Sequence, residues 1–158
     1  MDLIKNADFI ISKEDMGKVC PAFSKSFSAK KEVKKASAQI SALGVYEAYI
    51  NGKRVGDYIL APGWTTYHKR LQYQTYDITD MLQKDNVIEI NAGDGWLVEN
   101  LGHYSMMPWM PQNDRPAVIA AVEIEYNDGE KEVILTDESW KASKSEILKS
   151  TIYGGETY

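Results

Sequence analysis

Apolar and polar residues alternate with a period of two over much of this chain, and this pattern restricts the fold more than any other feature of the sequence. In the clearest run, one face carries every second residue of 118–126, while Glu123 and Glu125 point to the opposite face. Residues 36–42 and 86–91 alternate in the same way. No segment keeps a 3.6-residue apolar stripe over three turns. The pattern therefore predicts an all-β fold, an antiparallel β-sandwich.

Tight turns fix the pairing of neighbouring strands. Asn51 and Gly52 join residues 45–50 to residues 53–55, and this pair suits a type I′ hairpin because both central positions need a positive φ. Residues 127–129 supply a second hairpin turn. The other expected elements are extended segments at 9–11, 23–27, 71–76, 132–136, 139–142 and 147–153, and one helical turn at 77–82.

Composition and charge exclude several classes of protein. The 158 residues fit one domain, so we expect a single β-sandwich domain over 1–158. The net charge of −5 argues against a nucleic-acid partner, and the lack of a run of about 18 apolar residues argues against a membrane partner. The one cysteine, Cys20, allows no internal disulfide and no multi-cysteine metal site. It fits a reducing compartment, so we expect a cytoplasmic location, with secretion as the open alternative.

Residues 93–116 interrupt the strand pattern. This stretch is rich in glycine and proline and carries Trp96, Tyr104 and Trp109. A loop of this length inside a compact domain is uncommon, and it is usually either functional or disordered. Its aromatic content indicates that it packs against something.

Six motifs, in order between Ala36 and Tyr158, resemble the N-terminal β-sandwich domain of bacterial α-L-rhamnosidases. They are GVYEAYINGKRVGD at 44–57, LAPGWTTY at 60–67, LQYQTYDIT at 71–79, GDGW at 93–96, TDESWK at 136–141 and IYGGETY at 152–158. The resemblance implies a jelly-roll similar to galactose-binding domains, with no catalytic residue of its own. It also implies that the chain is an excised accessory domain of a longer glycoside hydrolase, in which a separate (α/α) barrel hydrolyses terminal α-L-rhamnose. Some relatives bind rhamnose through calcium, so Ca²⁺ is an expectation that rests on the resemblance alone.

The long loop holds the candidate ligand-binding residues. A saccharide presents an apolar C–H face and a ring of hydroxyls, so its recognition needs an aromatic platform beside hydrogen-bond acceptors in a concave site. We expect these groups among Asp94, Trp96, Asn100, His103, Tyr104, Trp109, Asn113 and Asp114. Gly93 and Gly95 would let a ligand approach the backbone beside Asp94. As open alternatives, Trp96 and Trp109 anchor the loop on the sandwich or face the catalytic barrel.

Two other tryptophans receive a structural interpretation. Trp64 follows Pro62 and Gly63 at a corner, and we expect it to fill the end of the core. Trp140 alternates with its neighbours and is expected to be a core strand residue.

Two functions stay open at this point. In the first, the chain recognises a rhamnosylated carbohydrate or glycoside. In the second, it is a structural module that docks on the catalytic barrel of the same polypeptide without binding sugar.

Overall fold

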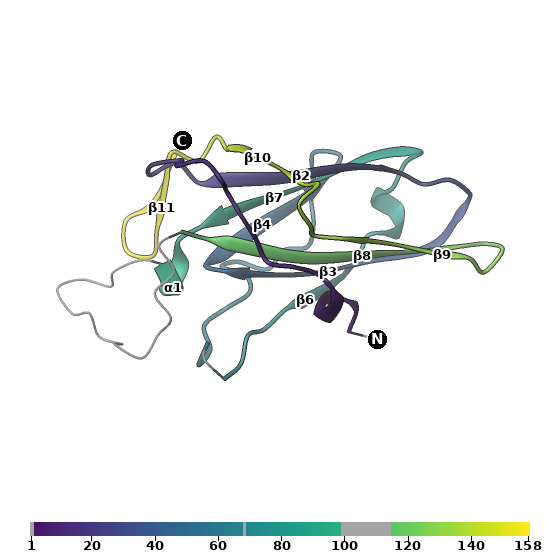
Figure 1. Cartoon of the computed structure of the whole chain (residues 1–158), viewed down its shortest axis with the longest axis horizontal. Helices are drawn as coiled ribbons and strands as arrows, with labels where there is room; N and C mark the ends of the chain where they lie inside the picture. Colours follow the sequence, from purple (N-terminus) through teal and green to yellow (C-terminus); the bar gives the residue numbers. More distant parts are fainter. Residues whose placement is uncertain (1, 68, 99–114) are drawn as a thin grey trace.

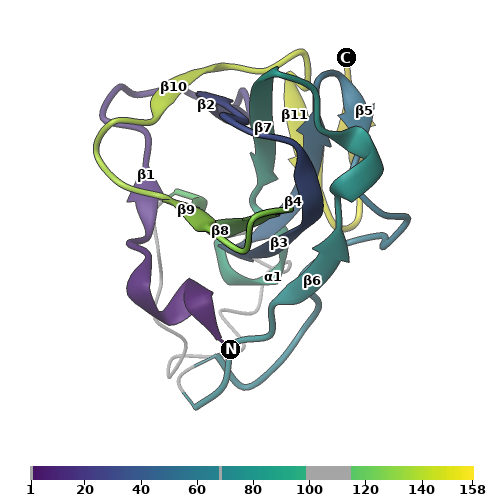
Figure 2. The ribbon, with the colours of Figure 1, turned by 90° about the vertical axis from the view of Figure 1, so that its right-hand side faces the viewer.

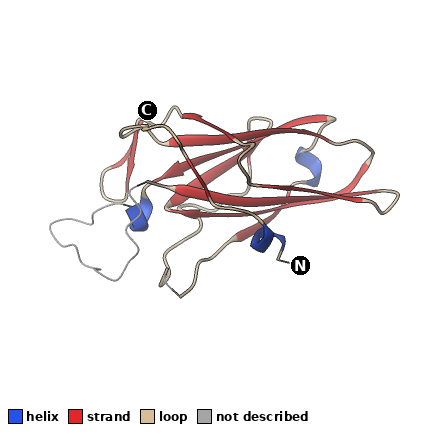
Figure 3. Ribbon diagram, viewed as in Figure 1, coloured by secondary structure: helices blue, strands red, loops and turns tan. Residues whose placement is uncertain are grey.

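The computed structural model describes residues 2–67, 69–98 and 115–158. Two antiparallel sheets pack face to face, and a short two-stranded sheet lies at one end of the sandwich (Figure 1). Most of the regular structure is strand, as Figure 3 shows. The helical segments are short: η1 (Leu3–Asn6), η2 (Thr79–Met81) and α1 (Gly95–Val98). Within the described ranges, no helix is long and apolar enough to span a membrane.

The first sheet has the strand order β1-β8-β3-β6, and β9 also pairs with β8. Its strands are β1 (Ile10–Ile11), β3 (Val33–Leu43), β6 (Gln74–Asp77), β8 (Ala117–Tyr126) and β9 (Lys131–Leu135). β1 pairs with residues 117–118 at the start of β8, whereas β9 pairs with residues 121–125 further along. The two short strands thus follow one another along the same edge of β8.

The second sheet has the strand order β10-β2-β7-β4-β5. Its strands are β2 (Pro21–Ser28), β4 (Val45–Ile50), β5 (Lys53–Arg54), β7 (Asp85–Gly93) and β10 (Lys141–Lys144). The small third sheet is a hairpin of β11 (Lys149–Thr151) and β12 (Gly155–Thr157). Figure 2 looks along the long axis and shows β2 and β7 in one layer and β3 and β8 in the other.

The core lies between the two sheets and is built by the alternating residues of the sequence. Ile40 and Val122 point inward from the first sheet, and Ile88 and Ile90 point inward from the second; all four are 0% exposed. Burial of such side chains contributes about 1.5–3 kcal/mol each relative to exposure. The all-β class and the antiparallel sandwich are therefore confirmed, while the jelly-roll connectivity stays a prediction.

The outer face of the first sheet is also partly covered. Ile4 of η1 packs with Ile119 and Ala121 of β8 on this face. The side chain of Gln39 accepts a hydrogen bond from the backbone N–H of Ile4 at 2.9 Å, and Ser41 donates to the carbonyl of Gln72 at 2.6 Å. Residues 38–42 of β3 and 117–122 of β8 are consequently buried on both faces.

The predicted turns and strands agree closely with the structure. Asn51 and Gly52 have φ values of 52° and 76°, as the type I′ hairpin requires. In the expected helical turn, Asp77 accepts a hydrogen bond from the backbone of Thr79 at 3.0 Å. The expected strand at 71–76 is shorter, since only Gln74–Asp77 pairs with β3.

The C-terminal region departs from the expectation. Trp140 is a core residue at 9% exposed, but it lies in the turn before β10 rather than in a strand. The expected strand at 147–153 is instead the first half of the β11–β12 hairpin. Its turn residues 152–154 break the extended backbone, so the strand ends at Thr151.

Candidate functional site

The candidate site lies where β7 ends, at the α1 end of the sandwich (Figure 1). Asp94 follows β7, and Gly95 opens α1 with a φ of 58°. A Cβ on Gly95 would lie 2.9 Å from the backbone of Gly44, and a Cβ on Gly93 would lie 2.9 Å from the hydroxyl of Ser150. The expected role of these glycines is therefore wrong in one respect, because the space beside them is occupied by the chain itself rather than left for a ligand. Their small size fixes the position of Asp94.

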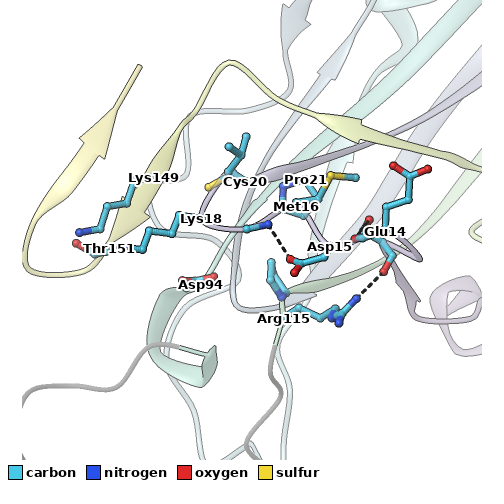
Figure 4. A pocket seen from close by; sticks show the side chains of 14 residues that line it. Glu14, Asp15, Met16, Lys18, Cys20, Pro21, Asp94, Arg115, Lys149 and Thr151 are labelled. Atoms are coloured by element: carbon cyan, nitrogen blue, oxygen red, sulfur yellow. Dashed lines mark hydrogen bonds between the residues drawn. The ribbon is translucent and has the colours of Figure 1, made fainter.

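Asp94 lines a hollow of about 360 Å³ (Figure 4). Four chain segments form it: the loop from Ser12 to Pro21, Asp94, residues 115–116, and the strand β11. Its charged side chains are three acids and three bases, namely Glu14, Asp15, Asp94, Lys18, Arg115 and Lys149. Figure 4 shows Lys149 and Thr151 on one side and Glu14 on the other.

Hydrogen bonds hold the walls of this hollow in place. Arg115 donates to the carbonyl of Ser12 at 3.1 Å, and Asp15 accepts from the backbone N–H of Gly17 at 2.8 Å. The backbone N–H of Cys20 donates to the carbonyl of Ile147 at 2.9 Å, which joins the loop to the segment before β11. The hollow is thus formed by the fold itself.

Cys20 is a buried residue that lines the hollow, and the pKa of its thiol is shifted. Burial raises the pKa of its thiol to about 11, and the negative charges of Asp94 and Glu156 add to the shift. The thiol is therefore neutral at physiological pH and contributes no charge to the site.

An aromatic pair includes Trp96, which follows Asp94 by two residues in the sequence. Trp96 of α1 stacks on Trp64, with ring centroids 6.3 Å apart and an angle of 12° between the rings. Trp64 is 55% exposed. The expectation that Trp64 fills the end of the core is therefore wrong; its ring packs on Trp96 at the surface, while Ala61 and Pro62 take the buried positions in its loop.

The structure describes two of the predicted site residues. Asp94 lies in the hollow, and Trp96 lies two residues later in the stacked pair. The other six predicted residues lie outside the described ranges: Asn100, His103, Tyr104, Trp109, Asn113 and Asp114. Sequence reasoning missed Lys18, Arg115 and Lys149, because no local motif signals residues that the fold brings together from distant segments.

Calcium prefers six to eight oxygen ligands, mostly from carboxylates and carbonyls. Across residues 2–67, 69–98 and 115–158, no group of three or more His, Cys, Asp or Glu side chains is placed to hold a metal ion. Around Asp94, the described bases Lys18, Arg115 and Lys149 accompany the acids. The described residues alone therefore do not fit a calcium ion.

Comparison with known proteins identifies relatives of this chain. A family model described as the alpha-L-rhamnosidase N-terminal domain matches residues 31–158. An alpha-L-rhamnosidase of Streptomyces avermitilis is 41% identical over 129 residues, which cover 81% of this chain and 12% of that protein. The chain thus spans about an eighth of the length of this curated relative.

Solved structures agree with the sequence comparison. The crystal structure of the Streptomyces avermitilis enzyme, complexed with L-rhamnose, matches with a TM-score of 0.81 and 38% identity, covering 89% of this chain and 14% of that one. The native alpha-L-rhamnosidase of Aspergillus terreus matches with a TM-score of 0.86 and 35% identity, covering 98% of this chain and 18% of that one.

Proposed function

The chain belongs to the family of α-L-rhamnosidase N-terminal domains, and from this premise we propose that it is a non-catalytic accessory domain that recognises rhamnose-containing glycosides. The observation that carries the proposal is the arrangement around Asp94. A preformed polar hollow is joined by the three residues 94–96 to a stacked tryptophan pair, in which Trp64 is exposed and Trp96 is half-buried. The hollow offers donors and acceptors for sugar hydroxyls, and the indole rings offer an apolar platform for the C–H face.

The relative from Streptomyces avermitilis supports this choice of ligand, since it was crystallised with L-rhamnose. The proposed partners are a rhamnosylated glycoside and the catalytic barrel of a longer polypeptide. In that arrangement the barrel performs the hydrolysis, while the domain described above binds substrate.

Calorimetric titration with methyl α-L-rhamnoside, with and without calcium, tests the proposal. We expect saturable binding by the wild-type chain and an affinity about tenfold weaker for Asp94→Asn, which loses one charged acceptor. Asp128→Asn is the matched control, because this carboxylate lies in the β8–β9 turn at the opposite end of the sandwich. The absence of binding at millimolar sugar in both conditions would refute recognition. Turnover of an aryl α-L-rhamnoside by the chain would refute its non-catalytic character.

A second candidate function is docking on the catalytic barrel, and one observation favours it. Four large apolar side chains of a single loop are exposed: Tyr58 at 50%, Ile59 at 76%, Leu60 at 46% and Trp64 at 55%. Exposed apolar clusters commonly mark interaction surfaces. If sugar fails to bind, titration with a separately produced rhamnosidase catalytic barrel distinguishes this function: Ile59→Ser should weaken the complex, and Val133→Ser, on the distant strand β9, should not.

A further inference from the structure

A second hollow lies on the other side of β11 from the hollow of Asp94. It has a volume of about 310 Å³ and lies between the outer face of the second sheet and the β11–β12 hairpin. The two hollows share only Cys20 and Thr151 among their described lining residues. Ser150 contacts the position above Gly93, so the hairpin approaches β7 there and closes one side of the second hollow. β11 is therefore the partition between two separate sites.

Asn91 supplies the most informative group in the second hollow. Its neighbours on β7, Ile90 and Ala92, point into the core, so Asn91 points to the outer face of the sheet. Its Oδ1 atom is buried and has no hydrogen-bond partner in the structure. Buried polar atoms are nearly always paired, and an exception in a concave site indicates a donor supplied from outside the chain.

The strands beside Asn91 explain why the chain offers no donor. The cross-strand neighbours of Asn91 are Ala22 on β2 and Glu47 on β4. Ala22 has no polar group. Glu47 is an acceptor like Asn91 itself, and its two oxygens receive hydrogen bonds from Tyr49 and Arg54, each at 2.8 Å.

The remaining lining selects the chemistry of the ligand. Among the described residues, no lysine, arginine or histidine lines this hollow, whereas Asn91, Glu47 and Glu156 all present acceptor oxygens. The hydroxyls of Ser150 and Thr151 also line the hollow and can donate, but the acceptor oxygens outnumber them, so a ligand that donates hydrogen bonds is favoured and an anion is disfavoured. Since Glu47 is already neutralised by Arg54, the site does not require a cation. Apolar side chains of Val45, Ile59 and Leu60 complete the wall, and they suit a C–H face.

We propose that the hollow between β7 and the β11–β12 hairpin is a second binding site, which takes one neutral sugar unit through a hydroxyl donated to Asn91 Oδ1. The proposal builds on the proposed role in carbohydrate recognition. However, the two sites lie on opposite sides of β11, so either can fail alone. With both occupied, one glycan chain contacts the domain at two points, which raises its apparent affinity without further contacts at either site.

Backbone amide NMR of the whole chain tests the second site with L-rhamnose, D-galactose and D-glucose as probes. We expect one of the three to shift the amide signals of Ser150 and Gly155 saturably. Asn91→Leu removes the acceptor and should weaken this response about tenfold, whereas Asn91→Asp keeps an acceptor and should respond nearly as the wild type does. Asp94→Asn should leave the response at Ser150 and Gly155 unchanged, although it weakens binding in the first hollow.

Three outcomes would overturn the second site. In the first, no sugar shifts the amide signals of Ser150 and Gly155. In the second, Asn91→Leu folds and binds sugar as the wild type does. In the third, Asn91→Asp keeps its acceptor but loses binding as fully as Asn91→Leu does. In the first case, the unpaired oxygen of Asn91 is satisfied by water alone. If the wild-type chain binds no sugar in the first hollow while Ser150 and Gly155 still respond, the proposed role of Asp94 is refuted and Asn91 remains as the sugar-binding residue.

Discussion

β7 carries an asparagine near each of its ends, and the two have opposite environments. Asn86 is 2% exposed and its side chain makes three hydrogen bonds: its Oδ1 accepts from the backbone N–H of Gln83 at 2.8 Å and from the side chain of Asn51 at 2.9 Å, and its Nδ2 donates to the carbonyl of Gln83 at 2.8 Å. Asn91 has a buried Oδ1 without any partner. The same residue type on the same strand is thus a structural connector at one end and an unsatisfied acceptor at the other.

The contrast extends to the two ends of the sandwich (Figure 1). We call the end with the turns at 29–32, 51–52 and 127–130 the closed end, and the end with α1 and the β11–β12 hairpin the open end. The closed end pairs its charges within the chain, as in Lys30 with Glu132 at 2.9 Å. The open end carries both hollows and the stacked tryptophan pair. Among the described residues, the buried side-chain oxygen without a partner, Asn91 Oδ1, lies at the open end, which is why the function is assigned there.

The largest expected effect comes from exchanging the two asparagines for leucine. Asn86→Leu removes three part-buried hydrogen bonds that each contribute about 0.5–1.5 kcal/mol, so we expect the free energy of unfolding to fall by roughly 3 kcal/mol. Asn91→Leu removes an atom that has no partner and should leave stability unchanged or slightly higher. Urea unfolding of both variants measures the difference. Equal losses would show that the two ends do not differ as described.

A second effect, at alkaline pH, belongs to the open end. The pKa of Cys20 is raised in the folded chain from its ordinary 9.0 to about 11, because burial disfavours the thiolate. A raised pKa means that the full stability is present below pH 9.0 and falls as pH rises toward about 11. Urea unfolding across this range should show a steeper decline for the wild type than for Cys20→Ala, which has no thiol to ionise. Parallel profiles would contradict the assigned burial effect.

The strands of this fold were predictable because burial alternates with the sequence. Every second residue of β8 faces the core, and β4 has the predicted bounds, 45–50. Prediction failed where tertiary contacts decide the backbone. Residues 71–73 were expected to pair, but Tyr73 packs on the cluster around Ile119, and Gln72 accepts a bond from Ser41.

The candidate site was predictable only in part, for a related reason. Asp94 and Trp96 lie in one motif, so the sequence indicated both. Trp64 was predicted to lie in the core because a large aromatic residue at a corner commonly fills the end of a sandwich. The structure instead places its ring on that of Trp96, a contact between distant residues that no sequence motif indicates. Asn91 follows the alternating pattern of its strand, so the sequence gives no reason to single it out. Its missing hydrogen-bond partner becomes visible only in the three-dimensional structure.

A third effect concerns the aromatic pair. Trp96→Ala removes half of the stacked platform, so we expect affinity for methyl α-L-rhamnoside to fall roughly tenfold while the fold persists. Trp140→Phe is the control, with the opposite expected outcome. It loses the hydrogen bond from Nε1 to the carbonyl of Leu135 at 2.9 Å, so we expect a lower free energy of unfolding and an unchanged affinity for sugar. Calorimetry and thermal unfolding of both variants separate the two roles. An unchanged affinity in Trp96→Ala would remove the platform from the proposal.

The smallest effect concerns the ion pairs of the closed end at acidic pH. The hydrogen bond from Lys30, with a further one from Tyr126, lowers the pKa of Glu132 below its ordinary 4.5. A lowered pKa contributes stability that is present above pH 4.5 and is lost as pH falls through the folded value. Lys30 is exposed and Glu132 is partly exposed, so this contribution is small and is screened by salt. In Lys30→Met, NMR titration of the Glu132 carboxyl should show a pKa closer to 4.5, while Lys149→Met at the open end should not move it. A carboxyl that titrates identically in Lys30→Met would show that the closed end does not hold its charges by pairing.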